Sequence, residues 1–436
     1  TPEDILTIIY TSGTTGVPKG VVLTQCNVMI NTDYGLKQLG LPHSEQTVLS
    51  FLPLSHILER TAGYYVTLLR GSHLAFAENV AQVMENMVEI RPTSMVSVPR
   101  LFEKIYSRIH ECVHQQPPPR RRVFFRALEI GKEYVTKKYV TKEPISGLLQ
   151  LKYQFYDQLV FKKIRDRFGG RLRYFICGGA PLDKTINEFM WAIGIPVYNG
   201  YGLTETSPAI TLSSADEVRF DSVGKVLPET EVKLAEDGEL LVRGPQVMQG
   251  YYRNEEANRE SFIDGWFATG DIARIDEEGF VYIIDRKKEL IVTAGGKNIA
   301  PQPIENDLKL DKYISQAIVF GDRKPYLTAL LTPNIERLID FAREENFAYI
   351  DINELVSHAR VLELYKERIA RLNKNYPPYK TIKKFALVAN DFSIEGGELT
   401  PTMKMKRKVI YEKYKGLVDD LYLNNGNGII AEQKKS

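Results

Sequence analysis

Short apolar runs alternate with amphipathic stretches along the first 285 residues. Runs of β-branched or apolar residues predict strands, and apolar residues three or four positions apart predict helices. We expect strands at residues 5–9, 21–23, 47–52, 94–98, 172–177 and 196–198, and helices at 80–90, 100–110 and 184–193. This alternation predicts an α/β architecture with a largely parallel sheet.

The pattern changes after Val223. Short strands expected at 231–234, 238–243 and 279–284, separated by turns, predict a β-rich subdomain at about 223–284. A charged stretch at 285–288 marks a domain boundary. Beyond it, strands at 317–320 and 327–331 and helices at 335–345 and 361–373 predict an α+β domain at 286–422, followed by a disordered polar tail at 423–436.

Composition narrows the class of protein. The chain has 436 residues, 43% of them hydrophobic, which is enough for two or more domains, and its net charge of +2 gives no support for a nucleic-acid partner. Three widely spaced cysteines, Cys26, Cys112 and Cys177, indicate neither a zinc site nor a disulfide framework, so a reducing, cytoplasmic compartment is expected. No uncharged apolar run reaches the roughly 18 residues of a membrane helix.

A basic insertion at 114–165 interrupts the α/β pattern. Residues 115–175 hold 15 Lys and Arg against 5 Asp and Glu, a local balance of +10. The insertion also contains eight interleaved aromatic residues: Phe124, Phe125, Tyr134, Tyr139, Tyr153, Phe155, Tyr156 and Phe161. One interpretation is peripheral contact with an anionic membrane surface or an acyl ligand. The other is a solvated basic helix pair whose aromatic side chains pack on the body of the protein.

Residues 10–20 are the most informative segment. They read Tyr-Thr-Ser-Gly-Thr-Thr-Gly-Val-Pro-Lys-Gly between two strand-like runs. Glycines allow backbone N–H groups to approach a ligand closely, hydroxyls add donors and the lysine adds positive charge, so the segment suits phosphate oxygens. A Walker-type loop differs because it opens a helix. A hairpin turn without a ligand is the alternative.

Five further segments follow in order: 53–60, 178–182, 200–206, 266–271 and 285–301. Each alone has a structural explanation, for example a strand-ending turn at 178–182 or Thr204 as the N-cap of a helix. Together with the loop at 10–20 they resemble the adenylate-forming superfamily of acyl-CoA synthetases, nonribosomal adenylation domains and luciferases. The segments 266–271, 285–301 and 399–404 resemble the long-chain fatty acyl-CoA synthetases most. The resemblance runs from Asp4 to about Lys415.

The resemblance implies a fold and a reaction. The fold has a large α/β AMP-binding domain at 1–285, a mobile α+β C-terminal domain and a hinge at Asp285. Because the chain starts at Thr1, just before the phosphate loop, we expect the large domain to be incomplete at its N-terminus. The implied reaction joins a fatty acid to coenzyme A: Mg-ATP first converts the acid to acyl-AMP and pyrophosphate, and coenzyme A then displaces AMP.

The same resemblance implies roles for individual residues. The β- and γ-phosphates would be held by Thr11, Ser12, Gly13, Thr14, Thr15, Gly16 and Lys19. The nucleotide would also contact Gly179, Ala180, Pro181, Tyr201 and Gly202, with Tyr201 stacked on adenine. Thr204 would contact the α-phosphate, Glu205 would bind Mg²⁺, and Asp271 with Arg286 would hold the ribose.

Three further roles follow from the resemblance. His56 would lie near the acyl carboxylate, Gly295 and Gly296 would face the pantetheine arm, and Lys404 would bridge the α-phosphate and the carboxylate. Lys406 and Lys408 are close competitors of Lys404. The alternative functions are another adenylating enzyme, of medium-chain, aryl or peptide-synthetase type, and a non-catalytic nucleotide- or acyl-binding protein.

Overall fold

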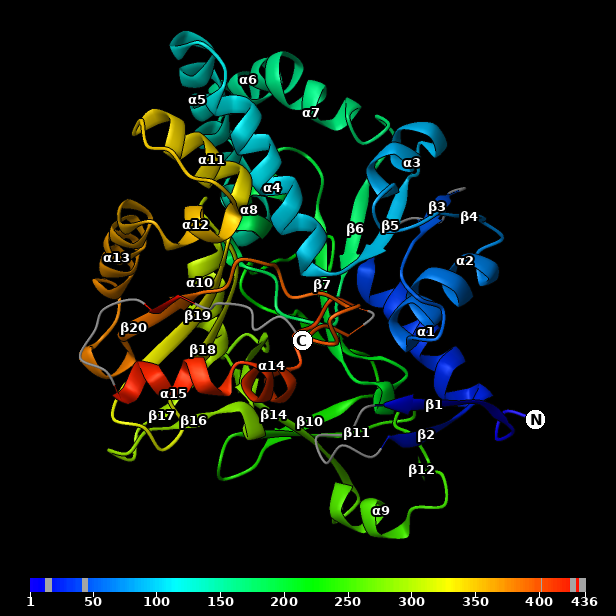
Figure 1. Ribbon diagram of the computed structural model, residues 1–436. Helices are drawn as coiled ribbons and strands as arrows, with labels where there is room; N and C mark the ends of the chain where they lie inside the picture. The colour runs from blue at the N-terminus through cyan, green and yellow to red at the C-terminus, as the bar shows by residue number, and fades with distance from the viewer. Residues whose placement is uncertain (12–17, 41–45, 401, 424–428, 431–436) are drawn as a thin grey trace. The chain divides into compact units, whose positions relative to one another are not determined.

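The computed structural model describes residues 1–11, 18–40, 46–400, 402–423 and 429–430. The chain divides into two compact units, Thr1–Ile283 and Ile284–Ser436 (Figure 1). Of the tail expected at 423–436, the described part comprises Leu423 and a two-residue strand, β21 (Ile429–Ile430).

The first unit is built around a seven-stranded sheet with the order β4-β3-β5-β6-β7-β8-β9. Its strands are β3 (Thr47–Ser50), β4 (His73–Phe76), β5 (Ser94–Ser97), β6 (Tyr174–Cys177), β7 (Val197–Gly202), β8 (Ala209–Leu212) and β9 (Lys225–Val226). Neighbours from β4 to β7 are parallel, which confirms the α/β prediction, whereas β8 and β9 form an antiparallel edge. The strand expected at 196–198 is longer and carries Tyr201 and Gly202.

Helices surround this sheet, and three of them lie close to the positions predicted. The helices are α1 (Gln25–Leu39), α2 (Val66–Leu69), α3 (Val83–Ile90), α4 (Pro99–His114), α5 (Pro118–Val135), α6 (Gly147–Tyr156), α7 (Lys162–Asp166) and α8 (Lys184–Ala192). Those close to the predicted positions are α3, α4 and α8, although the helix expected at 80–90 begins at Val83 instead. Buried Tyr134, Trp191 and Tyr198 lie in one hydrophobic cluster that joins α5 and α8 to β7.

Two smaller sheets complete the first unit. One has the order β1-β2-β12, formed by β1 (Ile5–Thr11), β2 (Lys19–Thr24) and β12 (Gly250–Tyr251). The other joins β10 (Glu231–Leu234), β11 (Glu239–Arg243), β13 (Phe262–Ile263), β14 (Trp266–Ile275) and β15 (Val281–Arg286), with α9 (Glu255–Ser261) between β12 and β13. The boundary between the two units falls within β15, so its last three residues belong to the second unit. Buried Val21, Val242 and Phe267 share a hydrophobic cluster that holds the two sheets together.

The second unit is a sheet covered on both faces. Its strands are β18 (Ile314–Phe320), β19 (Leu327–Pro333), β20 (Ile382–Leu387) and β21, and its helices are α10 (Pro301–Lys309), α11 (Ile335–Glu344), α12 (Ile352–Ser357), α13 (Ala359–Asn373), α14 (Arg407–Lys413) and α15 (Lys415–Leu423). A hairpin of β16 (Ile291–Val292) and β17 (Asn298–Ile299) precedes α10.

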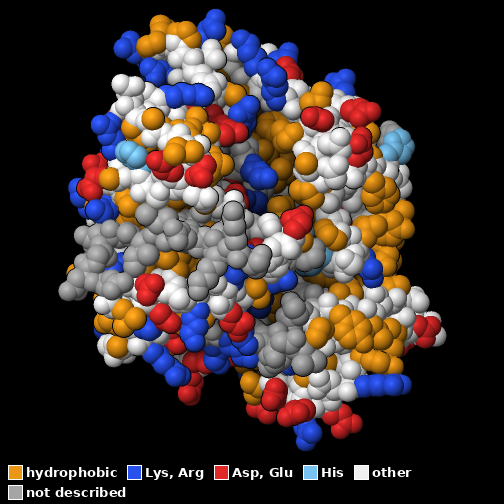
Figure 2. All heavy atoms as spheres, viewed as in Figure 1, with side chains coloured by type: hydrophobic (Ala, Val, Ile, Leu, Met, Phe, Trp, Pro, Cys, Tyr) orange, Lys and Arg blue, Asp and Glu red, His pale blue; other side chains and the backbone are white. Residues whose placement is uncertain are grey.

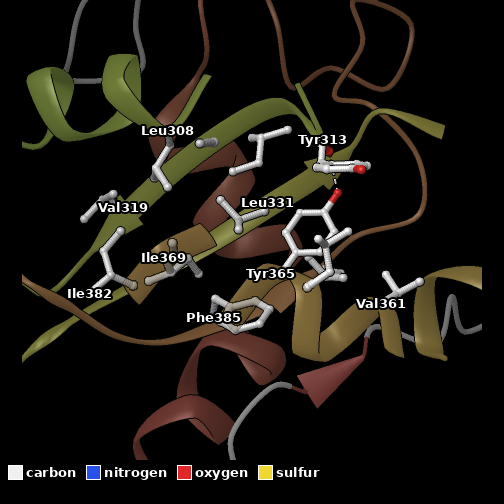
Figure 3. Close-up of a cluster of buried hydrophobic side chains, with 14 of the residues drawn as sticks. Leu308, Tyr313, Val319, Leu331, Val361, Tyr365, Ile369, Ile382 and Phe385 are labelled. Carbon is white, nitrogen blue, oxygen red and sulfur yellow. Dashed lines mark hydrogen bonds between the residues drawn. The ribbon is translucent and has the colours of Figure 1, made fainter. Parts of the chain in front are cut away.

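Residues along β18 alternate between the two faces of the second unit's sheet. Val319 lies in the cluster under α10 and α13, and its neighbour Ile318 lies in the cluster under α14 and α15. Figure 3 shows the first cluster, where the Tyr365 hydroxyl donates a hydrogen bond to the backbone carbonyl of Tyr313. The continuous apolar run in β18 is therefore the signature of a strand buried on both faces.

Candidate active site

The predicted motifs of the first unit follow the carboxyl ends of its parallel strands. Ser97 in β5, Cys177 in β6 and Asn199 in β7 are the last residues through which these three strands pair, and they lie side by side. Residues 178–182 and 200–206 begin directly after this row, and residues 53–60 lie beyond the end of β3. Ligands of open α/β sheets bind at this edge. The topology therefore gathers three motifs that are far apart in the sequence.

Gly178 marks the point where these three motifs meet. A Cβ atom at Gly178 would lie 3.2 Å from a methyl of Leu58 and 3.5 Å from the carbonyl oxygen of Gly200. Gly202 is tighter still, since a Cβ atom there would lie 1.8 Å from the carbonyl oxygen of Pro208. Glycine is required at Gly202 because the backbone approaches too closely for a side chain, whereas a Cβ atom at Gly178 would only press on the side chain of Leu58.

The phosphate-loop motif joins two antiparallel strands, as predicted. Thr11 at the end of β1 pairs with Lys19 at the start of β2, so the two strands form the base of the loop. Ser12, Gly13, Thr14, Thr15 and Gly16 lie outside the described residues. The interpretation of this segment as a phosphate cradle stays a prediction.

Lys19 and Glu205 are linked through Tyr251, a residue that sequence reasoning missed. The Lys19 ammonium lies 5.0 Å from the centre of the Tyr251 ring, and the Tyr251 hydroxyl donates a 2.9 Å hydrogen bond to Glu205 Oε1. Burial and the neighbouring Glu205 raise the pKa of Tyr251 well above its ordinary value, so the hydroxyl stays a donor. The available signal was the pair Gly250-Tyr251, which forms β12 beside β2.

Tyr201 and Asp271 meet although 70 residues separate them. The Tyr201 hydroxyl donates a 2.7 Å hydrogen bond to Asp271 Oδ2. Asp271 is buried in β14, where its backbone N–H donates to the hydroxyl of Thr269. Gly270, which lies between Thr269 and Asp271 in the same strand, donates its N–H to Glu239. The carboxylate is thus oriented beside an aromatic ring, an arrangement that suits a ribose next to a base.

The remaining nucleotide residues of the first unit lie on the same edge. Gly179 has a φ of +83°, a conformation that favours glycine, and Ala180 and Pro181 are half-buried beside it. Thr204 is the first residue of a short 3₁₀ turn, η4 (Thr204–Thr206), so the N-cap interpretation is wrong: the preceding residue is the cap. Thr204 is half-buried and directly precedes Glu205 in the chain.

His56 is held as a neutral donor. Its Nδ1 accepts the backbone N–H of Leu58 at 3.3 Å, which leaves Nε2 as the protonated nitrogen. Burial lowers the pKa of His56, so the ring is neutral at pH 7. Arg60, which the sequence did not single out, fixes this loop: it donates to the carbonyl of Leu54 and the hydroxyl of Thr7, both at 2.7 Å.

A buried acid, Glu59, stands between His56 and Arg60. It begins a π-helical segment, η1 (Glu59–Tyr65), and neither carboxyl oxygen meets a hydrogen-bond partner within the described residues. Burial raises its pKa to about 7. Such segments are frequent at functional sites.

Five predicted residues belong to the second unit: Asp285, Arg286, Gly295, Gly296 and Lys404. Asp285 is buried and accepts the backbone N–H groups of Arg286 and Gln302, the latter in the first turn of α10. Burial raises the pKa of Asp285 to about 6.

Gly295, Gly296 and Lys404 lie in two turns of the second unit. The glycines form the exposed turn between β16 and β17, with Gly296 at a φ of +71°. Lys404 is half-buried, and its backbone N–H donates to the hydroxyl of Thr400 across a turn that includes Met403 at a φ of +60°.

The donor set around Glu205 fits a hard cation. Within the part of the chain that the structure describes, no group of three or more His, Cys, Asp or Glu side chains could hold a metal. Mg²⁺ does not need such a cage, because it binds through one or two carboxylates together with phosphate oxygens and water. Tyr251 orients one oxygen of Glu205, and no Lys or Arg of the described residues forms an ion pair with that carboxylate. Glu205 therefore keeps its charge for a ligand.

Comparison with known families identifies both halves of the chain. Residues 1–252 match the AMP-binding enzyme family, and residues 288–426 match the AMP-binding enzyme C-terminal domain. Among curated relatives, the long-chain-fatty-acid–CoA ligase FadD15 of Mycobacterium bovis is 37% identical over an alignment of 425 residues that covers 96% of this chain and 69% of the relative. Human long-chain-fatty-acid–CoA ligase ACSBG1 is 35% identical over an alignment of 453 residues, gaps included, that covers 97% of this chain and 62% of the relative.

Solved structures share the fold at lower identity. The A domain of a carboxylic acid reductase from Segniliparus rugosus, in complex with AMP and a co-purified carboxylic acid, aligns with a TM-score of 0.73 and 20% identity, covering 97% of this chain and 62% of that one. o-Succinylbenzoate CoA synthetase from Bacillus subtilis, in complex with its acyl-adenylate intermediate, gives 0.65 and 23%, covering 94% and 69%.

Proposed function

We propose, because this chain belongs to the AMP-binding enzyme family, that it activates a fatty acid with ATP and transfers the acyl group to coenzyme A. The fatty-acid–CoA ligases among its relatives support this reaction. The finer assignment, a preference for long-chain acids, is supported by the relatives named as long-chain-fatty-acid–CoA ligases. A cytoplasmic location is proposed from the three cysteines, all of which are free thiols.

One observation carries the proposal: two linked sets of side chains, one through Tyr201 and one through Glu205, meet at the segment 200–206. An aromatic ring with a carboxylate beside it, Tyr201 with Asp271, suits a nucleoside. A lysine and a carboxylate joined by Tyr251, Lys19 with Glu205, suit a polyphosphate and its divalent cation. A nucleoside triphosphate with its metal satisfies both demands at once.

The adenylation step is a problem of charge. A carboxylate must attack the α-phosphorus of ATP, and pyrophosphate must leave. Lys19 would hold the β- and γ-phosphates, and Thr204 would donate to the α-phosphate. Glu205 would hold Mg²⁺, which would neutralise charge on the phosphates. Preorganised groups of this kind lower the barrier because they need no rearrangement as charge moves.

His56 would orient the acid. Because its Nδ1 is occupied by a backbone N–H, its Nε2–H can donate to one carboxylate oxygen while the other attacks phosphorus. A neutral imidazole positions the nucleophile without forming an ion pair that would weaken it. Arg60 would act indirectly, because it joins the loop of His56 to β1, the strand that leads into the phosphate loop.

The second unit would supply different groups to the two half-reactions. Lys404 would stabilise charge on the carboxylate and the α-phosphate during adenylation. A rotation about Asp285 would then bring Gly295 and Gly296, with their exposed backbone, to the pantetheine arm of coenzyme A. We assign residues 1–285 to an AMP-binding domain and 286–422 to this mobile domain. Hinge motions of this kind are a known class of functional change.

Substitution of Lys404 tests the division of labour. Lys404→Ala should abolish acid-dependent pyrophosphate release and spare thioester formation from supplied acyl-AMP. Lys408→Ala, on the exposed face of α14, is the matched control and should preserve both steps. Equal loss of both steps in Lys404→Ala, or adenylation lost in the control, would overturn the assignment.

A chain-length series tests the substrate class. Pyrophosphate release would be measured with acids of medium, long and aryl type. The highest kcat/KM is expected for long-chain acids. A preference for an aryl or amino acid would identify another adenylating enzyme, and ATP binding without turnover on any acid would favour a non-catalytic binding protein.

A further inference from the structure

Helix α6 of the insertion is apolar on two opposite faces. Its inner face packs on α5: Leu149 is buried, and the ring of Tyr153 stacks on that of Tyr134 at 4.1 Å. Phe161, in the π-helical segment η3 (Asp157–Phe161) that continues α6, is also fully buried. These aromatic side chains therefore pack on the body of the protein, whereas Phe155 does not.

The outer face of α6 and of its continuation η3 carries four large, exposed hydrophobic side chains. Leu148, Leu151, Phe155 and Leu159, here called the outer stripe, are exposed by 64%, 65%, 61% and 41%. They stand at positions i, i+3, i+7 and i+11, so they follow one side of the helix. A helix that is apolar on both sides is normally covered on both sides, and a run of exposed apolar residues marks an interaction surface.

Positive charge borders the outer stripe. Lys152 lies within it, and Lys162 and Lys163 follow it at the start of α7, all three on the exposed side. None of them forms an ion pair within the described residues. At the top of Figure 2, where α5 and α6 lie in Figure 1, blue and orange side chains gather together. The acidic neighbour Asp157 is paired with Arg165 at 2.6 Å, so it does not offset the lysines.

We propose that the outer stripe docks on the surface of an anionic lipid bilayer. A bilayer accepts both halves of this surface at once, because leucine and phenylalanine enter the acyl boundary and lysines meet the headgroups. If a second copy of the chain covered this surface instead, the lysines of one copy would face the lysines of the other, and like charges repel. Among the described helices none is long and apolar enough to cross a membrane.

Vesicle binding by the whole chain tests this surface without ATP or substrate. The wild-type chain should bind vesicles of phosphatidylcholine with phosphatidylglycerol much more tightly than vesicles of phosphatidylcholine alone. The variant Leu148→Ser/Leu151→Ser/Phe155→Ser should lower the partition coefficient about a hundredfold, since three apolar side chains no longer leave water. Lys152→Gln/Lys162→Gln/Lys163→Gln should lower it about a hundredfold on anionic vesicles only.

The chain offers a matched control. Leu68, Leu69 and Phe76 are the same residue types, exposed by 54%, 51% and 59%, but lie in α2 and β4. Their replacement by serine should leave vesicle binding unchanged. Equal loss in both serine variants, or no binding by the wild type, would overturn the proposal. So would a dimer of the wild type that the outer-stripe variant converts to a monomer, because a second copy would then cover the face.

Fluorescence locates the contact directly. In Phe155→Trp, brominated lipids in anionic vesicles should quench the new indole beyond the quenching seen in the wild type, whose tryptophans are the buried Trp191 and the half-buried Trp266. Quenching equal to that of the wild type would show that α6 does not reach the acyl region and would contradict the docking geometry.

Discussion

Glu205 and Asp271 of the candidate site are held by different partners from Glu305, a buried carboxylate of the second unit. In the first unit, Glu205 and Asp271 accept hydrogen bonds from tyrosine hydroxyls at 2.9 and 2.7 Å. In the second unit, Glu305 forms a 2.7 Å ion pair with Arg407. A tyrosine hydroxyl orients a carboxylate and leaves its negative charge in place, whereas a guanidinium cancels that charge. The first arrangement leaves the carboxylate able to bind a ligand, and the second stabilises the fold.

The ion pair of the second unit is surrounded by further structural bonds. Glu305 Oε1 also accepts the backbone N–H of Val319, and Arg407 donates to the carbonyl of the same residue. The pair thus fastens α14 and α10 to β18. Its removal should change stability, while changes to the tyrosine-held carboxylates should change chemistry.

The largest expected effect is on the stability of the second unit. Arg407→Met leaves Glu305 buried without a cation, so the free energy of unfolding should fall by about 3–5 kcal/mol. Urea denaturation followed by circular dichroism measures this. Arg360→Met, which breaks an exposed pair with Glu345, is the control and should cost less than about 1 kcal/mol. Equal losses of unfolding free energy in the two variants would show that the buried ion pair of Arg407 with Glu305 does not stabilise the fold more than an exposed pair.

Glu59, which is held by neither a tyrosine hydroxyl nor a guanidinium, should make the free energy of unfolding depend on pH. Its pKa is about 7 in the folded protein against an ordinary value of 4.5, so between these values the folded state retains a proton that the unfolded state has lost. This group's contribution to stability therefore falls as pH rises from about 5 to 7 and is constant above that range.

Glu59→Gln should remove that dependence. The free energy of unfolding of the variant, relative to the wild type, should rise by about 3 kcal/mol between pH 5 and pH 8. Urea titrations of both proteins at the two pH values give the difference, and the other titrating groups cancel in the comparison. A difference that stays constant with pH would show that Glu59 is not held protonated.

In the first unit, Glu205→Gln should affect activity far more than stability. The amide can still accept the hydrogen bond of Tyr251 but carries no charge for Mg²⁺, so kcat/KM for pyrophosphate release should fall about a hundredfold. The urea midpoint should barely move. Glu255→Gln, in the exposed first turn of α9, is the control. A large loss of stability in Glu205→Gln would show that this carboxylate, like Glu305, mainly stabilises the fold.

The smallest effect concerns Tyr201. Tyr201→Phe keeps the ring that would stack on adenine and removes the hydroxyl that orients Asp271, so KM for ATP should rise about tenfold with a smaller change in kcat. Steady-state kinetics with varied ATP measures it, and Tyr252→Phe, at an exposed position, serves as the control. An unchanged KM would mean that Asp271 is oriented without this bond.

Much of the fold could be predicted because both units have strong periodic patterns. The parallel strands β3, β5 and β6 are short apolar runs, and α8 starts at the expected residue, since Asp183 caps it by accepting the N–H groups of Thr185 and Ile186. The antiparallel edge at β8 and β9 was missed because β9 has two residues and neither strand alternates clearly.

The site was predictable only where a motif is local in sequence. The segments at 178–182 and 200–206 could be located, but the contact of Tyr251 with Glu205 joins residues 46 positions apart through strand pairing. Periodicity carries no information about such a partner. For the same reason the role of Arg60 could be seen only in the structure, because this residue of η1 donates a hydrogen bond to Thr7 in β1.

The most direct test of fatty acid activation follows one oxygen atom. A fatty acid labelled with oxygen-18 in its carboxyl group would be converted with ATP and coenzyme A, and the products analysed by mass spectrometry. Adenylation joins a carboxylate oxygen to the α-phosphorus, and displacement by the thiolate breaks the bond between that oxygen and the acyl carbon. The account therefore predicts one labelled oxygen in AMP and none in pyrophosphate. Unlabelled AMP, or label in inorganic phosphate with ADP as the nucleotide product, would contradict it.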